Sequence, residues 1–307
     1  MTKPLQLSWL VVAGSAAIAC SRADLDAITR APDGGAGGRP PVVCPSPALP
    51  PGDTTAMVQV GAVTRSYVLH VPTAYDGSRP AALLVDFHAL SGSGMQQRMG
   101  SPFPGETDPD GAVMAFPTGL VGPSGSAWHI GPCCVANVDD VAFAKALVAD
   151  VARTACIDPA RVYATGFSMG GGMAHYVACH AADVFAAVAP IAFDLLQENA
   201  ADCQPSRPIT VISFRGNADP LISYDGGASA VVPGMPVTFL GAQATFMKWA
   251  ELDQCPGTPS AQDSNGCSTY ANCQGGTEVV LCARQVTGQE QSDASIGWPV
   301  LKRHTLP

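Results

Sequence analysis

Two periods of apolar and polar residues follow one another along the chain, and they predict strands interleaved with helices. Residues 64–71 alternate with the period of two that is typical of a half-buried strand. The run AALLVDFH at 81–88 is almost continuously apolar, as in a strand that is covered on both faces. Further strands are predicted at 111–117, 161–167, 184–191, 209–215 and 278–283.

The helical period first occurs after Asn137, which can cap a helix that runs to about Thr154, with Asp139 and Asp140 at its positive end. The apolar stripe of this helix consists of Val138, Val141, Ala144, Leu147, Val148 and Val151. Further helices are predicted at Met169–His180, Ala242–Leu252 and 293–304. Strands that alternate with helices predict an α/β fold, with a mainly parallel sheet and helices on both faces.

Composition narrows the class of protein. The 307 residues, 47% of them hydrophobic, are enough for one large α/β domain. The net charge of −9 and the lack of a basic run leave nothing to bind a phosphate backbone, so we expect no nucleic-acid partner. No apolar stretch after the N-terminus approaches 18 residues, so no internal membrane span is predicted.

The N-terminus has the pattern of an export signal. Lys3 supplies a positive charge, residues 5–19 are apolar, and the small residues at 17–19 form a cleavage site. Cys20 follows directly, which indicates a lipoprotein anchored through this cysteine; ordinary cleavage and free secretion are the alternative. The predicted organisation is a signal peptide at 1–19, a lipid-anchor cysteine and flexible spacer at 20–43, and a domain at 44–307.

The cysteines indicate an oxidising compartment. Of eleven cysteines, ten remain without Cys20, an even number that fits disulfides. No C-x-x-C pair occurs, so we expect no metal site, and no cofactor is implied. Strand 161–167 rises about 20 Å and helix 169–179 returns about 15 Å, which predicts a Cys156–Cys179 disulfide at the bottom of the sheet. The neighbours Cys133 and Cys134 are each expected to have a distant partner.

The segment GFSMG at 166–170 carries the strongest chemical signal. It follows a predicted strand and opens a predicted helix, which is the context of a nucleophile elbow with Ser168 as nucleophile. A glycine-rich turn without chemistry is the alternative. Asp219 lies just beyond strand 209–215, at the edge of the sheet where catalytic groups collect, and is the candidate orienting acid. An aspartate in an ordinary turn before proline is the alternative.

Backbone amides supply the candidate oxyanion hole. The buried strand at 81–88 ends in a loop of small residues, so we assign one donor to the Leu90 amide, with Ala89 as competitor. The Met169 amide is the other donor. His88 is expected to shape this loop by hydrogen bonding. Trp128 offers a flat apolar face for an acyl group or a sugar, with burial in the core as an equal alternative.

Four segments resemble one family: 156–171 (CIDPARVYATGFSMGG), 216–220 (GNADP), 224–227 (YDGG) and 139–143 (DDVAF). They are similar to the secreted feruloyl esterase and polyhydroxybutyrate depolymerase-like group of α/β-hydrolases, over about 44–307. The resemblance implies an α/β-hydrolase fold and a Ser–Asp–His esterase acting on hydroxycinnamoyl, acetyl or hydroxyalkanoate esters. It carries the serine and the aspartate over to Ser168 and Asp219. The usual His-Gly after the early strand is here His88-Ala89.

The catalytic histidine departs from the family pattern. In the family it lies in the loop between the last strand and the terminal helix, and residues 286–293 contain none. Gln291 is the expected occupant, and an amide cannot take the serine proton. Glu290, His304 and His129, the last on a loop that can approach the site, are the alternative bases.

Two hypotheses follow. The first is an exported serine esterase, monomeric, whose substrate is an ester derived from plant polysaccharide or polyester. Loss of the histidine would impair its activity. The second is a catalytically silent relative that binds an ester or a glycan at the cell surface, and the residue at the histidine position distinguishes the two.

Overall fold

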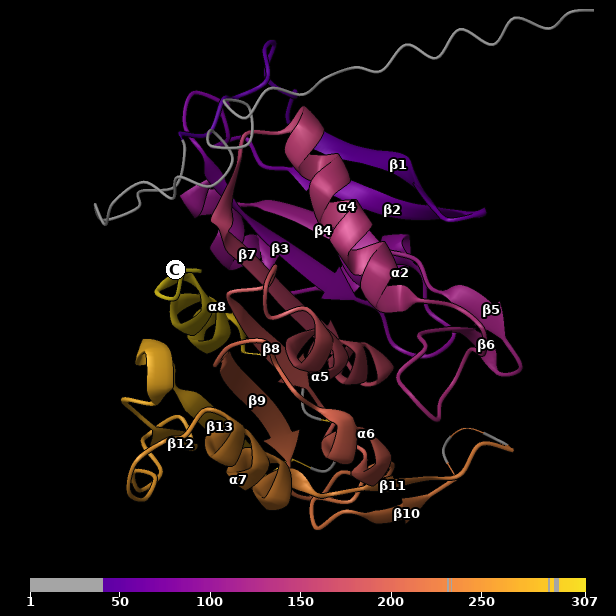
Figure 1. Ribbon diagram of the computed structural model, residues 1–307, viewed down its shortest axis with the longest axis vertical. Coiled ribbons are helices and arrows are strands. Elements are labelled where there is room, and N and C mark those ends of the chain that lie inside the picture. The colour runs from indigo at the N-terminus through magenta and orange to yellow at the C-terminus, as the bar shows by residue number, and fades with distance from the viewer. Residues whose placement is uncertain (1–40, 231, 233, 287, 290–292) are drawn as a thin grey trace, which may run out of the picture. The chain divides into compact units, whose positions relative to one another are not determined.

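The computed structural model describes residues 41–230, 232, 234–286, 288–289 and 293–307. The signal peptide, Cys20 and most of the spacer predicted above lie outside these residues. The main sheet contains nine of the strands that these residues form (Figure 1). Their bounds are β1 Gly52–Val60, β2 Val63–Val71, β3 Ala81–Phe87, β4 Val113–Pro117, β7 Ile157–Phe167, β8 Ala187–Ile191, β9 Thr210–Gly216, β12 Cys267–Tyr270 and β13 Val279–Arg284.

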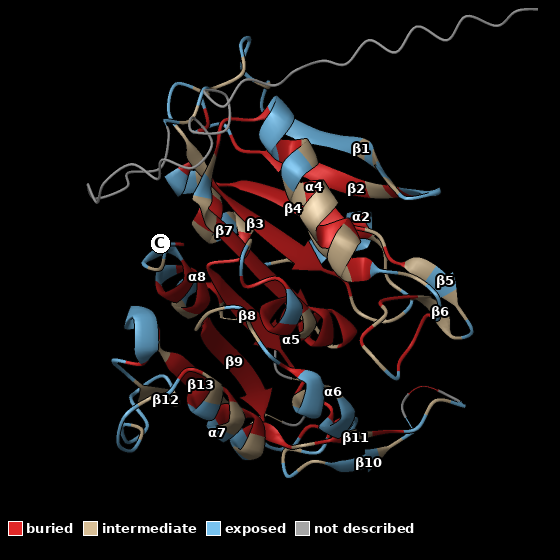
Figure 2. Cartoon of the chain, viewed as in Figure 1, coloured by how far each residue is buried: buried red, intermediate tan, exposed pale blue. Residues whose placement is uncertain are grey.

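The strands of this sheet are ordered β1-β2-β4-β3-β7-β8-β9-β13-β12. Strands β4, β3, β7, β8, β9 and β13 run parallel, and the antiparallel pairs are at the two edges. Two short hairpins stand apart from the sheet: β5 Leu120–Gly122 with β6 Gly125–Ala127, and β10 Gly227–Ser229 with β11 Val237–Phe239. The central strands are buried along almost their whole length, because helices cover both faces (Figure 2).

The helices divide between the two faces. Their bounds are α2 Gly94–Gly100, α3 Pro104–Thr107, η1 Asp108–Asp110, α4 Asp140–Thr154, α5 Met169–His180, α6 Gln197–Asp202, α7 Ala242–Leu252, η2 Gln274–Gly276 and α8 Ala294–Lys302. Leu147, Met173 and Trp249 bring α4, α5 and α7 into one core. Phe103, beside α3, and Trp298 of α8 belong to the core on the opposite face. The predicted α/β fold with helices on both faces is therefore confirmed.

Most predicted elements agree with the structure, and α5 and α7 have the predicted bounds. The prediction of Asn137 as the cap of α4 was wrong. Asp139 caps this helix, since its carboxylate accepts a hydrogen bond from the Ala142 amide at 2.8 Å. Asn137 instead takes a left-handed backbone with φ 60°. Strand β1 was not predicted, because it is an edge strand whose residues are exposed or half-buried and so lack a clean alternation.

Ten cysteines form five disulfides, in keeping with the predicted even set. The pairs are Cys44–Cys156, Cys133–Cys134, Cys179–Cys203, Cys255–Cys273 and Cys267–Cys282. Among the residues described, no group of three His, Cys, Asp or Glu side chains could hold a metal ion. Within the same residues, no helix has both the length and the apolar character to cross a membrane.

Two disulfide predictions were wrong. Cys156 pairs with Cys44, and Cys179 at the end of α5 pairs with Cys203 after α6, so the predicted Cys156–Cys179 bond does not exist. Strand and helix lengths place both cysteines at the same end of the sheet. Helix α5, however, is separated from β7 by a layer of side chains. Cys44 and Cys203 lie closer to Cys156 and Cys179 than these two cysteines lie to each other. Cys133 and Cys134 bond to each other rather than to distant partners.

The Cys44–Cys156 bond closes a much longer loop than Cys179–Cys203, with sequence separations of 112 and 24. Loss of either bond should cost about 2–5 kcal/mol, and loop entropy makes the longer loop worth about 1.4 kcal/mol more. We therefore expect Cys44→Ala/Cys156→Ala to lower the free energy of unfolding more than Cys179→Ala/Cys203→Ala does. Urea denaturation of the two double variants measures this difference; an equal loss would contradict the loop-entropy account.

Candidate active site

Ser168 lies in a sharp turn between β7 and α5. Its backbone has φ 52° and ψ −120°, a conformation that a residue with a side chain rarely adopts and that surrounding contacts must hold. The Ser168 amide donates a hydrogen bond to the Ile191 carbonyl at the end of β8, at 2.9 Å. The serine side chain is half-buried at the carboxyl edge of the parallel strands, where ligands bind in open α/β sheets.

Two glycines make this turn possible. A Cβ on Gly170 would lie 1.9 Å from the Phe87 carbonyl oxygen, and a Cβ on Gly166 would lie 2.4 Å from the Gly170 backbone. Neither position has room for any side chain, so the backbone at the start of α5 packs directly against the end of β3. This arrangement has the geometry of the predicted nucleophile elbow.

The loop after β3 is fixed by His88. The Gly119 amide donates a hydrogen bond to His88 Nε2 at 2.9 Å, so the imidazole proton is on Nδ1, which donates to the Ala89 carbonyl at 2.6 Å. Burial lowers the pKa of His88, which keeps the ring neutral. His88 therefore shapes the loop that carries Leu90, and Leu90 and Met169 both line the cavity beside Ser168.

Trp128 is fully buried behind this loop. Its Nε1 donates a hydrogen bond to the His88 carbonyl at 2.9 Å, and its ring packs edge-on against Phe87 with 5.2 Å between ring centroids. The indole has no exposed face for an acyl group or a sugar. Of the two alternatives that the sequence left open, the structure places Trp128 in the core.

Asp219 belongs to a buried cluster of charges. Its Oδ1 accepts hydrogen bonds from the Leu221 and Ile222 amides at 2.8 and 3.1 Å, and its Oδ2 lies 3.5 Å from Arg215 Nη1. The same guanidinium contacts Asp194 through Nε at 3.0 Å. Burial raises the pKa of Asp194 to about 7, against the opposing effect of Arg215. Arg215 thus holds two carboxylates, one after β8 and one after β9, near the serine edge of the sheet.

Gln289 contacts the side chain of Ser168. Its Nε2 lies 3.3 Å from Ser168 Oγ, in the loop between β13 and α8. Gln291, the predicted occupant of the histidine position, lies outside the described residues, as does Glu290. The signal for Gln289 was present: it follows Gly288, and the resemblance implies a histidine in a glycine-rich run of this loop.

The two histidines named as alternative bases lie elsewhere. His129 Nδ1 is 2.7 Å from the Val135 carbonyl, and its ring lines a hollow with Tyr176 and His180. His304 Nε2 is 2.6 Å from Glu278, directly before the start of β13, at the sheet edge opposite to Ser168. Among the described residues, no histidine side chain hydrogen-bonds to Ser168.

A small apolar cavity of about 30 Å³ adjoins Ser168. Its walls include Ile130, Phe193, Ile222 and Phe239, together with Cys133 of the Cys133–Cys134 disulfide. None of the described residues in its wall carries a charged side chain, so this part of the cavity suits the apolar part of an acyl group. In the described conformation it holds little more than water, and a larger acyl group requires the side chains of β11 and the adjacent loop to move.

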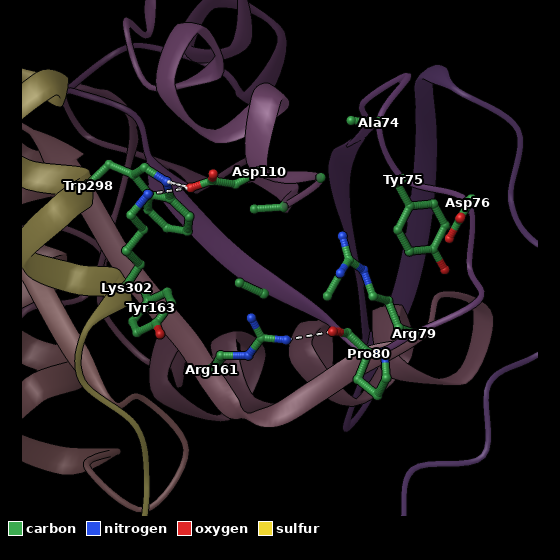
Figure 3. Close-up of a pocket in the computed structure, with 14 residues that line it drawn as sticks. Ala74, Tyr75, Asp76, Arg79, Pro80, Asp110, Arg161, Tyr163, Trp298 and Lys302 are labelled. Atoms are coloured by element: carbon green, nitrogen blue, oxygen red, sulfur yellow. Dashed lines mark hydrogen bonds and ion pairs between the residues drawn. The ribbon is translucent and has the colours of Figure 1, made fainter.

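A further cavity of about 340 Å³ lies at the opposite edge of the sheet, near the start of β3 and β7. Figure 3 shows Arg161 directed at the Pro80 carbonyl, and both Trp298 and Lys302 directed at Asp110. Two of the three cations in its lining are thus engaged by the protein itself. The cavity contains no side chain of the serine site.

The strand order, with Ser168 in the turn between β7 and α5, is that of the α/β-hydrolase fold. The solved structure of an acetyl xylan esterase from Aspergillus awamori has the same fold, with a TM-score of 0.58 and 13% identity over 81% of this chain and 98% of that one. No protein-family model matches the chain.

Two curated relatives are more similar in sequence. Feruloyl esterase B of Piromyces equi is 42% identical over 246 residues, which span 79% of this chain and 46% of that protein. Feruloyl esterase C of Emericella nidulans is 33% identical over 171 residues, 54% of this chain and 58% of that protein. The chain thus spans about half the length of the curated relatives it matches. It has the α/β-hydrolase fold, and its sequence is similar to these feruloyl esterases.

The elbow yields a test with an internal control. Gly170→Ala should prevent stable folding or displace α5, because its Cβ would overlap the Phe87 carbonyl. Gly105→Ala, in α3, has nothing within 4 Å of its Cβ and should leave stability unchanged or raise it by up to about 1 kcal/mol. Thermal unfolding of both variants compares them, and a normally stable Gly170→Ala protein would argue against the close contact.

Proposed function

We propose that the protein is an exported serine esterase that hydrolyses carboxylic esters through an acyl-enzyme on Ser168. The observation that carries this proposal is the elbow: Ser168 stands at the helix N-terminus beside an apolar cavity that the Met169 and Leu90 residues also line. The names of the relatives favour feruloyl or acetyl esters of plant polysaccharides as substrates. Hydroxyalkanoate polyesters are the alternative from the sequence resemblance.

In this mechanism Ser168 Oγ attacks the ester carbonyl, and the amides of Met169 and Leu90 stabilise the negative charge on the carbonyl oxygen. The alcohol leaves with a proton, and water then hydrolyses the acyl-enzyme. Both steps need a group that accepts and returns a proton. Asp219 is the proposed orienting acid for such a group, and the Gln289 amide at the serine oxygen cannot itself accept the proton.

One observation supports the second hypothesis, a silent protein that binds an ester or a glycan. Gln289 is hydrogen-bonded to Ser168 from the loop in which the family has its base. A binding protein would retain the elbow and the cavity without needing proton transfer. The esterase and the binding protein differ in the result expected when a histidine is introduced beside Ser168: only the esterase should gain activity.

We expect weak or absent hydrolysis of p-nitrophenyl acetate and methyl ferulate by the unaltered protein. Without a triad histidine, the oxyanion hole and binding leave about 10³ to 10⁴-fold over water. Gln291→His should raise kcat by about 10²-fold or more, the contribution of a general base. Gln289→His, at the residue that contacts Ser168, is the matched variant in case it is the effective position.

Ser168→Ala in each background is the control and should remove the activity. If neither histidine variant gains activity while both stay folded, the binding hypothesis is preferred. If the unaltered protein is already fully active, another group is the base. Glu290→Ala then tests the remaining candidate of the sequence analysis, because His129 and His304 lie away from Ser168.

We also propose that residues 1–19 are a signal peptide, that Cys20 carries a lipid anchor on a spacer at 20–43, and that 44–307 is the catalytic domain. The five disulfides fit an exported protein. Even pairing of the other ten cysteines leaves Cys20 without a partner among them. A single lipidated cysteine after a signal sequence explains this odd cysteine.

Cys20→Ser should therefore release the protein from the membrane fraction without changing its thermal unfolding, because Cys20 lies outside the five pairs. Fractionation of expressing cells, with mass spectrometry of the N-terminal peptide, measures both effects. An unaltered protein found wholly in the soluble secreted fraction would contradict the anchor and leave ordinary secretion.

A further inference from the structure

We infer that the disulfide between Cys133 and Cys134 determines which acyl groups the site accepts. It forms the fixed wall of the apolar cavity beside Ser168 and thereby limits the length of the acyl chain. This role rests on the proposed function, since it concerns the acyl part of the same ester. The bond takes no part in the mechanism described above.

The bond between these adjacent cysteines is the least able of the five disulfides to stabilise the fold through chain entropy. It joins residues with a sequence separation of 1, whereas the other four bonds have separations of 15 to 112. The entropy that a disulfide removes from the unfolded chain grows with the length of the loop that it closes. A bond that closes almost no loop therefore constrains mainly its own surroundings in the folded chain.

Cys133 is part of the wall of the candidate active site. It lines the apolar cavity together with Ser168, Leu90 and Met169. Cys133 and Cys134 are both buried, with 4% and 2% of their surface exposed. In a disulfide neither sulfur carries the S–H group that would donate a hydrogen bond. The wall at Cys133 therefore suits the methylene groups of an acyl chain.

Backbone hydrogen bonds hold the loop that carries this disulfide. The Cys134 amide donates to the Trp128 carbonyl at 3.0 Å. The Ile130 amide donates to the Cys133 carbonyl. Trp128 is itself fully buried, and its Nε1 donates to the His88 carbonyl at 2.9 Å. The disulfide is therefore fixed in position relative to the loop after β3, which supplies the proposed oxyanion donor.

Two side chains tie the same loop to neighbouring helices. Asn199 of α6 donates from Nδ2 to the Ile130 carbonyl at 3.0 Å. Asp140, at the start of α4, accepts a hydrogen bond from the His129 amide at 2.7 Å. Asp140 is held in turn by a buried ion pair with Arg65 at 2.7 Å. An acyl chain that enters the cavity therefore meets, at the disulfide, a wall that is braced from several sides.

The volume of the cavity sets the limit on the acyl chain. Its 30 Å³ are about the size of one water molecule or one methyl group. Because the disulfide wall is braced, a longer chain must displace the opposite wall, which includes Val237 and Phe239 of β11. The cost of that displacement disfavours longer acyl groups relative to acetyl.

The test alters the wall in opposite directions and measures kcat/KM for p-nitrophenyl acetate and p-nitrophenyl butanoate, which share a leaving group. It uses whichever of the unaltered protein and the two histidine variants is most active. Cys133→Ala/Cys134→Ala should raise the ratio of butanoate to acetate about tenfold, because the additional methylene groups of butanoate gain room. Cys133→Leu/Cys134→Ala should lower this ratio about fivefold or more, because the leucine side chain fills the cavity.

Cys255→Ala/Cys273→Ala is the matched control. It removes a disulfide whose cysteines do not line the cavity, so the ratio should stay unchanged. A general loss of stability lowers the rates of both esters together and leaves the ratio as it was. If one of the two wall variants does not fold, the ratio of the other decides. A ratio that is unaltered, or that shifts in the same direction in both wall variants, overturns the inference.

Failure of the proposed function would be visible separately, as hydrolysis of both esters no faster than in Ser168→Ala. NMR titration of Ser168→Ala protein with ethyl acetate and ethyl butanoate then tests the wall without catalysis. Adding Cys133→Ala/Cys134→Ala should strengthen the binding of ethyl butanoate relative to ethyl acetate about fivefold or more. An unchanged preference, or no binding of either ester, overturns the inference.

Discussion

The contact of Gly170 with the Phe87 carbonyl is the constraint on which the site depends. A Cβ at this glycine would stand 1.9 Å from the oxygen, so the first turn of α5 rests directly on the end of β3. Phe87 is also the residue before the His88 loop that carries Leu90. This backbone contact therefore sets the position of Ser168 relative to the loop that carries Leu90, and the positive-φ backbone of Ser168 costs about 1–3 kcal/mol that the surrounding packing must offset.

Charge interactions hold Asp219, the other candidate residue of the site, independently of the contact at Gly170. Arg215 is fully buried between Asp194 and Asp219, and a buried guanidinium is tolerable only when carboxylates and carbonyls satisfy it. Arg215 also donates to the Ile222 carbonyl at 2.9 Å, beyond the turn that contains Asp219. Asp219 is thus oriented by Arg215 of the preceding strand and by the amides that follow it. None of these contacts needs an imidazole.

The sequence predicted what depends on periodicity and chain order. Helices α5 and α7 have the expected bounds because their apolar stripes are regular, and Ser168 and Asp219 reach one sheet edge because both follow parallel strands. The sequence did not predict the disulfide pairs, because these depend on how far apart neighbouring elements lie sideways in the sheet and its helix layers. Lengths along a strand and a helix could not show that Cys44 and Cys203 lie closer to Cys156 and Cys179 than these lie to each other.

The sequence also holds little information on which residue of an irregular loop reaches a given point in the site. The segment after β13 has no period, so the position of the missing histidine was counted back from the terminal helix, which gave Gln291. The structure describes Gln289 against Ser168, whereas Gln291 lies outside the described residues, so that its assignment stays a prediction. Trp128 was ambiguous for a different reason: an indole fits a core and a binding surface equally well, and only the neighbouring His88 carbonyl, which binds its Nε1, decides.

The contacts that hold the site in place are therefore distinct from any group that would transfer a proton in it. The turn at Ser168, the loop that carries Leu90 and the Asp219 side chain are each held by contacts with the sheet and with neighbouring residues. An amide in the loop after β13 can donate to Ser168 Oγ and hold it in place, but it offers no basic nitrogen. The strained turn at Ser168 and the apolar cavity beside it therefore bear on what the site binds. The proposed ester cleavage needs in addition a group that accepts a proton, which the Gln289 amide at Ser168 does not provide.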